Sequence, residues 1–105
     1  MSEEKVWIRL CAAADAPADG TLLLAEAAGR DICLANVDGT LRAVDNRCPH
    51  RDGPLHEGWI ENGEIICPWH SWSFDPQTGK CTNATGCVNA YPVKTQDSDV
   101  LIQLA

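Results

Sequence analysis

The sequence predicts an all-β fold, a small sandwich or barrel of short antiparallel strands that carries one inserted subdomain. Polar and apolar side chains alternate over short segments, which is typical of half-buried strands. Turn-forming residues recur about every eight to twelve positions, the usual spacing in all-β domains. No segment repeats apolar residues at helical spacing over several turns. The 105 residues are enough for one small domain, residues 1–105.

The first part of the chain predicts four strands and one loop. Residues 5–10 alternate polar and apolar side chains and predict an opening strand. Residues 12–20 are expected to form a structured loop, because Pro17 and Gly20 end the alanine-rich run too early for a stable helix. An antiparallel meander with a tight turn at Asp38-Gly39 follows, and its strands are expected at 21–25, 31–35 and 40–44.

The strongest turn signal in the chain is Asn62-Gly63. It predicts a hairpin in which residues 59–61 pair with residues 64–66. The segment before this hairpin, from Asp45 to Leu55, is rich in turn formers and is expected to be irregular. Alternation returns at 72–75 and is followed by a turn at 76–79.

The chain is expected to end in two strands that belong to the base of the fold. They are predicted at 90–94 and 100–104, joined by an acidic turn. A subdomain inserted at about 47–80 then leaves a base fold of residues 1–46 and 81–105, and we expect the two ends of the chain to pair with each other.

Composition narrows the class of partner. The formal net charge is −7 at pH 7 and no block of consecutive lysines or arginines occurs, which argues against nucleic acid or an anionic membrane and favours a basic protein partner. The acidic start, without a long apolar run, predicts neither a signal peptide nor a membrane span. The expected location is the cytoplasm, where the six cysteines stay free or bind metal.

Two cysteine pairs lie outside the strongest motif of the chain. Cys11 and Cys33 lie among apolar strand residues and are interpreted as small core side chains. Cys81 and Cys87 flank a short loop, and a bridge between them or an additional ligand there is the minority interpretation.

The strongest motif is the pair of segments Cys48-Pro49-His50 and Cys67-Pro68-Trp69-His70. Each offers one thiolate and one imidazole, so together they provide four metal ligands. Structural zinc and a two-iron cluster both accept these donors. Zinc fingers usually group like ligands, whereas each segment here is mixed. Mixed pairs let both cysteines meet at one iron and both histidines at the other, which favours the cluster.

These residues resemble the Rieske iron–sulfur family, and the resemblance continues through Cys67–Asp75 and the closing Tyr91-Pro92-Val93-Lys94. It implies an all-β Rieske-like fold and one [2Fe–2S] cluster, bound by Cys48 and Cys67 at the inner iron and by His50 and His70 at the outer one. The histidines would then lie at the tip of the protein, where a docked partner exchanges electrons.

Departures from the family imply a low reduction potential. Gly53 and Trp69 occupy the positions at which high-potential members carry a bridging cysteine pair, so that bridge is impossible here. Trp72 and Phe74 replace hydroxyl side chains that donate to the cluster sulfurs, which predicts a potential near the low end of the Rieske range, about −150 mV. Packing around the cluster is expected for Trp69 as well as for these two residues.

Two further departures concern the backbone near the ligands. Ser71 stands where soluble Rieske ferredoxins usually carry glycine. Residues 83–86 lack the proline-rich loop that shields the cluster in many relatives. The remaining histidine, His56, is expected to face solvent. Solvated or loop-bracing roles, with a share in partner choice, are expected for the charged residues that flank the ligands, namely Arg47, Arg51, Asp52, Glu57 and Asp75.

The resemblance leads to two functional hypotheses. The first is a ferredoxin that carries one electron from a flavin-containing reductase to a terminal oxygenase. With three histidines in all, the chain cannot add an oxygen-activating metal site, so no catalytic residue is predicted. The second is the small subunit of an assimilatory NAD(P)H nitrite reductase, bound to its large subunit. The sequence resembles these nitrite reductase subunits at Thr78-Gly79-Lys80, Gly86-Cys87-Val88 and Tyr91-Pro92-Val93. A zinc-stabilised β interaction module without redox activity is the third hypothesis.

Overall fold

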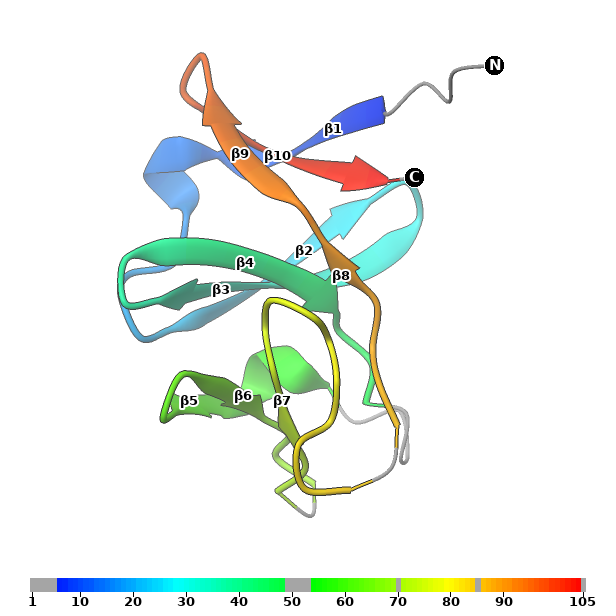
Figure 1. Ribbon diagram of the computed structural model, residues 1–105. Coiled ribbons are helices and arrows are strands. Elements are labelled where there is room, and N and C mark those ends of the chain that lie inside the picture. Colours follow the sequence, from blue (N-terminus) through cyan, green and yellow to red (C-terminus); the bar gives the residue numbers. More distant parts are fainter. Residues whose placement is uncertain (1–5, 49–53, 70, 85, 105) are drawn as a thin grey trace.

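The computed structural model describes residues 6–48, 54–69, 71–84 and 86–104, and these fold into three antiparallel sheets (Figure 1). The first sheet has the order β1-β10-β9, the second β2-β3-β4-β8 and the third β5-β6-β7. Figure 1 shows the first two sheets together as a base and the third in a separate lobe beneath them. The predicted all-β fold is therefore confirmed.

The strands have the following bounds. The first sheet contains β1 (Val6–Ala12), β9 (Val93–Gln96) and β10 (Asp99–Leu104). The second contains β2 (Leu22–Ala27), β3 (Arg30–Val37), β4 (Thr40–Asp45) and β8 (Ala90–Tyr91). The third contains β5 (Trp59–Glu61), β6 (Glu64–Ile66) and β7 (Ser73–Phe74).

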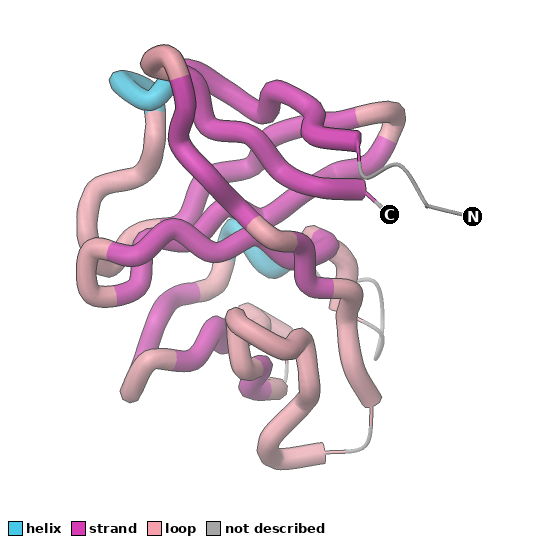
Figure 2. Tube along the Cα trace, turned by 45° about the horizontal axis from the view of Figure 1, so that its top comes forward, coloured by secondary structure: helices cyan, strands magenta, loops and turns pink. Residues whose placement is uncertain are grey.

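The two ends of the chain pair with each other, as expected. Strand β1 runs antiparallel to β10, from Val6 opposite Leu104 to Ala12 opposite Asp99. The tube in Figure 2 shows the described ends of the chain, where β1 begins and β10 ends, on the same side of the base. The first sheet thus pairs strands from opposite ends of the sequence, and the middle of the chain forms the lobe.

Both hairpins predicted from short turn sequences are confirmed. Asp38 and Gly39 have φ of 54° and 86°, and they join β3 to β4. Asn62 and Gly63 have φ of 53° and 77°, and they join β5 to β6. Left-handed conformations at two successive residues are those that a tight two-residue hairpin loop requires.

One predicted strand, 90–94, is in fact two strands in different sheets. Residues before Pro92 form β8, which pairs with β4, and residues after it form β9, which pairs with β10. Proline lacks the N–H that a continuous ladder needs, and the Pro92 carbonyl instead accepts the N–H of Gln103 at 3.0 Å. The chain therefore changes sheet at this residue.

Short helical turns occur at two places where loops were expected. The 3₁₀ turn η1 (Ala13–Asp15) lies within the predicted loop after the first strand. The second turn, η2 (Leu55–Glu57), begins at the end of the segment predicted to be irregular. Within the described ranges, no helix has the length and apolar character needed to cross a membrane.

The second sheet is the central layer, because its strands bury side chains on both faces. Ile32 and Leu34 of β3 pack with Val100 and Ile102 of the first sheet. Their neighbours on the opposite face of β3 pack toward the lobe, in a cluster that contains Cys33, Ala35, Val44, Leu55, Ile65 and Phe74. This alternation explains why β3 contains four consecutive buried residues. The second of these two cores is continuous with both predicted cysteine ligands.

Gly58 provides a test of how tightly the lobe packs. A Cβ atom at this residue would lie 1.8 Å from the carbonyl oxygen of Ile66, one residue before Cys67. Because backbone cannot easily move aside, we expect Gly58→Ala to lower the free energy of unfolding by about 3 kcal/mol, measured by thermal unfolding followed by circular dichroism.

Gly20→Ala is the matched control. Gly20 has a φ of 83°, but nothing lies within 4 Å of an added Cβ, so only backbone strain of about 1 kcal/mol opposes the change. Equal destabilisation by the two substitutions would contradict close packing at Gly58.

Candidate metal centre

The first predicted ligand segment follows directly from β4. Cys48 is 1% exposed and belongs to the core between the central sheet and the lobe. The buried Asn46 closes this segment, because its main-chain carbonyl accepts the N–H of Leu55 at 3.2 Å. Its side-chain oxygen accepts the N–H of His56 at 2.6 Å. Asn46 thus joins the residues before Cys48 to the residues that begin the lobe.

His56 does not face solvent as expected. Its side chain is 26% exposed, and its Nδ1 atom lies 2.9 Å from Nδ2 of Asn46. The amide oxygen of Asn46 already accepts a hydrogen bond, so Nδ2 is the donor and Nδ1 the acceptor. His56 therefore helps to close the first ligand segment. Sequence reasoning missed this contact because its two partners are separated along the chain.

The second predicted ligand segment follows directly from the β5–β6 hairpin. Cys67 comes after Ile66, the last residue of β6, and its N–H donates to the carbonyl of Trp72 at 2.7 Å. The N–H of Trp69 donates to Sγ of Cys67 at 3.4 Å. The hairpin and these two bonds give the Cys67 sulfur a defined place at the lower face of the central sheet.

The two cysteines meet, as the metal hypothesis requires. The Cys67 thiol is 0% exposed and lies within hydrogen-bonding reach of the Cys48 thiol. Burial raises the pKa of Cys67 to about 11; the N–H of Trp69 opposes this rise and Cys48 adds to it. Burial disfavours a thiolate at Cys67 unless a cation supplies compensating charge, so this buried pair of cysteines fits a metal centre.

The other two predicted ligands, His50 and His70, lie outside the described residues. Within the described ranges, no group of three or more histidine, cysteine or carboxylate side chains gathers as a metal site. The structure therefore brings Cys48 and Cys67 together, and the assignment of the two histidines stays a prediction.

The aromatic residues around the thiols differ in exposure. Phe74 is fully buried in the same core as both cysteines, and Trp72 packs against that core. Trp69 is 46% exposed, so its packing against the cluster stays a prediction. The Phe74 ring cannot donate a hydrogen bond to sulfur, which agrees with the loss of a hydroxyl inferred from the sequence.

No disulfide joins Cys81 to Cys87. All six cysteines lie in the described ranges and all are free thiols, with Cys81 buried and Cys87 exposed. The Cys81 thiol instead donates to Oδ1 of Asn83 at 3.5 Å. Cys33 is a buried core residue, as expected, and burial raises the pKa of its thiol to about 12.

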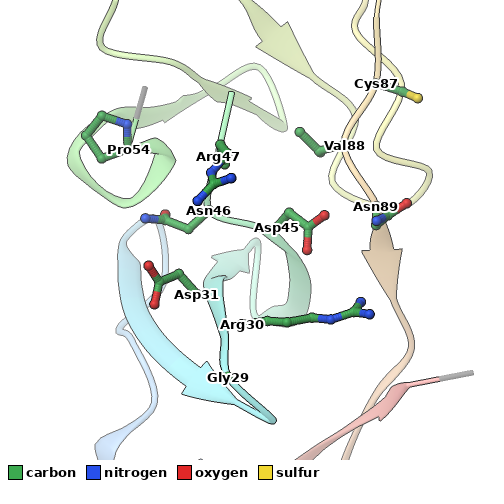
Figure 3. Close-up of a pocket in the computed structure, with 10 residues that line it drawn as sticks. All are labelled: Gly29, Arg30, Asp31, Asp45, Asn46, Arg47, Pro54, Cys87, Val88 and Asn89. Atoms are coloured by element: carbon green, nitrogen blue, oxygen red, sulfur yellow. The ribbon is translucent and has the colours of Figure 1, made fainter. Parts of the chain in front are cut away.

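An open polar groove of about 750 Å³ lies where the central sheet meets the segment after Cys87 (Figure 3). Figure 3 shows charged side chains of both signs around it, including Arg30, Asp31 and Asp45. The guanidinium of Arg30 donates to the hydroxyl of Tyr91 at 3.0 Å, and this hydroxyl donates to Asp45 at 2.6 Å. The groove side chains thus link β3, β4 and β8, which is a structural role.

Ser71 has a φ of 56°, in the left-handed region that favours glycine. The glycine that the family resemblance leads us to expect at this position would adopt this conformation freely. The backbone after His70 therefore makes the turn that a glycine would make, at the cost of strain.

Comparison with known proteins supports the same family. The Rieske [2Fe–2S] domain family matches residues 6–95. The chain is 36% identical over 101 residues to the ferredoxin component of the naphthalene 1,2-dioxygenase system of Pseudomonas putida, covering 94% of this chain and 96% of the relative.

Solved structures confirm the fold. A ferredoxin of Sphingomonas yanoikuyae B1 superposes with a TM-score of 0.83 at 30% identity and covers 97% of this chain and 100% of that one. A putative NADH-dependent nitrite reductase small subunit of Mycobacterium tuberculosis superposes with a TM-score of 0.86 at 20% identity, with 98% of each chain covered. At that identity, the second likeness supports the fold alone.

Ser71→Gly tests the strain in the second ligand segment. Glycine adopts the left-handed conformation without a Cβ clash, so we expect the substitution to stabilise the protein by about 1 kcal/mol, seen as a rise of several degrees in Tm. Ser73→Gly is the control, because Ser73 lies in strand β7, where glycine is unfavourable. A lower Tm for both variants would refute the strain at Ser71.

Proposed function

Because the chain belongs to the Rieske [2Fe–2S] domain family, we propose that it is the ferredoxin component of an oxygenase system. In this role it receives electrons from a flavin-containing reductase and passes them, one at a time, to a terminal oxygenase. The observation that carries this proposal is the 36% identity that spans 94% of this chain and 96% of a ferredoxin component. The protein is an electron carrier, and the oxygenation chemistry takes place on its partner.

The ligands that we propose for the cluster are Cys48 and Cys67 at one iron and His50 and His70 at the other. The support for the cysteines is their contact in a shared, fully buried core. The support for the histidines is their place in the family motif. When bound, the cluster supplies a reversible one-electron couple.

The protein around the sulfurs determines the potential of the couple. The N–H of Trp69 stabilises negative charge on the Cys67 sulfur. Phe74 and Trp72 offer carbon surface where high-potential members offer hydroxyl groups. We therefore place the potential near the low end of the Rieske range, about −150 mV. A carrier at this potential accepts electrons from a flavin and donates them to a similar cluster.

Two features of the whole chain complete the proposal. The net charge of −7 complements a basic docking surface on each redox partner. The location that we propose is the cytoplasm, a reducing compartment in which the six cysteines stay free or bind metal.

The cluster-binding subdomain that we propose at about 47–80 contains the sheet β5-β6-β7. Bridges from Phe74 to Cys81 and from Lys80 to Cys87 support extending this subdomain to Cys87.

The nitrite reductase and zinc hypotheses are weaker. The nitrite reductase small subunit shares the fold but only 20% of the residues, and no contact in the described part of the chain favours that role. The zinc hypothesis conflicts with membership in a family defined by a [2Fe–2S] cluster. A colourless protein that contains stoichiometric zinc and no sulfide would reverse this conclusion.

Substitution of single cysteines tests the proposed ligands. We expect Cys48→Ser and Cys67→Ser to abolish the visible absorption and the reduced-state EPR signal of the purified protein, because each removes a thiolate from the same iron. Cys33→Ala is the matched control, since Cys33 is equally buried but lies in β3. The Cys33→Ala protein should be less stable but should keep the cluster. Loss of the cluster in all three variants would instead indicate a general folding defect.

Reduction by a partner tests the function. Holoprotein mixed with NADH and the purified flavin reductase of a dioxygenase system should lose visible absorbance as it is reduced. The rate should fall several-fold from low to high salt, because charge complementarity speeds the encounter. A stable, salt-resistant complex with a sirohaem-containing large subunit, together with no reduction by the reductase, would favour the nitrite reductase role.

A further inference from the structure

In the loop after Cys81, the side chain of Asn83 bonds to the backbone that follows the second ligand segment. Its Nδ2 donates to the main-chain carbonyl of Ser71 at 3.0 Å. Its Oδ1 accepts the main-chain N–H of Ser73 at 3.0 Å. The two bonds span Trp72, whose carbonyl accepts the N–H of Cys67. Asn83 therefore holds the backbone on both sides of the residue that closes the Cys67 turn.

These bonds continue a β-ladder by means of a side chain. Strand β7 pairs with the following segment through a bridge from Phe74 to Cys81 and through the N–H of Thr82, which donates to Ser73 at 2.9 Å. Beyond Thr82, the side-chain carboxamide of Asn83 makes the hydrogen bonds in place of a peptide group, because it too offers a donor and an acceptor. The ladder thereby reaches back from Ser73 to Ser71, the residue that follows His70 in the sequence.

The ladder ends at Ser71, a residue with a strained backbone conformation. Ser71 has a left-handed φ of 56°, a conformation that costs a residue with a Cβ about 1–2 kcal/mol. The bond from Asn83 to the Ser71 carbonyl is a contact that can enforce it. The Oδ1 atom is itself oriented from the other side by the thiol of Cys81 at 3.5 Å.

We propose that Asn83 is a positioning residue for the cluster, acting through the backbone of Ser71 and Ser73. This inference rests on the proposed function, because it concerns the segment that carries Cys67 and His70. Asn83 holds the strained turn between the second histidine and β7, and so restrains the geometry of the ligands on that segment.

The chain provides a matched control at Asn36, which makes the same kind of contacts in the base. Its Nδ2 donates to the carbonyl of Pro17 at 3.0 Å, and its Oδ1 accepts the N–H of Gly39 at 2.9 Å. Asn36 lies in β3, at the turn to β4, and its contacts are confined to the base. Asn83→Ala and Asn36→Ala therefore remove similar bonds at different distances from the ligands.

The experiment compares wild-type, Asn83→Ala and Asn36→Ala holoproteins by three measurements: reduction potential, EPR g-values and the rate at which a chelator removes iron. We expect Asn83→Ala to shift the potential and the g-values and to lose iron about tenfold faster, because the loss of two hydrogen bonds loosens the segment. Asn36→Ala should lower Tm and leave the potential, the g-values and the rate of iron loss unchanged. The proposal would be overturned if Asn83→Ala kept wild-type values in all three measurements. It would also be overturned if Asn83→Ala and Asn36→Ala shifted these values equally.

A double variant separates positioning from general stability. In Ser71→Gly the turn no longer needs to be enforced, so adding Asn83→Ala should change the g-values and the iron-loss rate much less than it does with Ser71 present. If Asn83→Ala had the same effect in the Ser71→Gly protein as in the wild type, Asn83 would not act through the backbone of Ser71. Failure of the proposed function is seen separately, because wild-type protein would then contain no [2Fe–2S] cluster.

Discussion

The burial of two thiols against each other is the constraint on which the rest of the structure depends. Cys48 and Cys67 lie in the core that joins the central sheet to the lobe, together with Phe74. Burial favours the neutral form of Cys67, whereas a bound metal favours its thiolate. Metal binding is therefore coupled to the packing of the lobe on the base, as in small metalloproteins whose folding energy includes the metal–ligand bonds.

Next to each ligand segment, the side-chain amide of an asparagine hydrogen-bonds to the main chain as a peptide group would. Asn46 binds main-chain groups and the ring of His56 beside the first segment. Asn83 binds Ser71 and Ser73 in the second. Irregular loops cannot satisfy their backbone by regular ladders, so side-chain amides provide the missing partners. Both asparagines thus bond to described backbone next to a ligand segment.

The role of electron carrier follows from what the chain combines. Its relatives include ferredoxin components, its two buried sulfurs lie in an apolar core that contains Phe74, and its formal net charge is −7. The polar groove beneath Arg30 is braced by Tyr91 and Asp45, which link neighbouring strands. Function thus depends on a buried redox centre and on the surface that brings a partner close to it.

The sequence by itself determined the features that depend on local geometry or on a motif. The hairpins at Asp38-Gly39 and Asn62-Gly63 were predictable because their left-handed backbone is a property of the turn residues themselves. The contact of Cys48 with Cys67 was predictable because the family motif encodes it.

Only the tertiary structure decided the change of sheet at Pro92, the contact of His56 with Asn46 and the contacts of Asn83. Each of these depends on a partner distant in the chain, such as Gln103 for Pro92. An asparagine amide pairs equally well with any exposed peptide group, so its partner is set by the fold that brings one within reach.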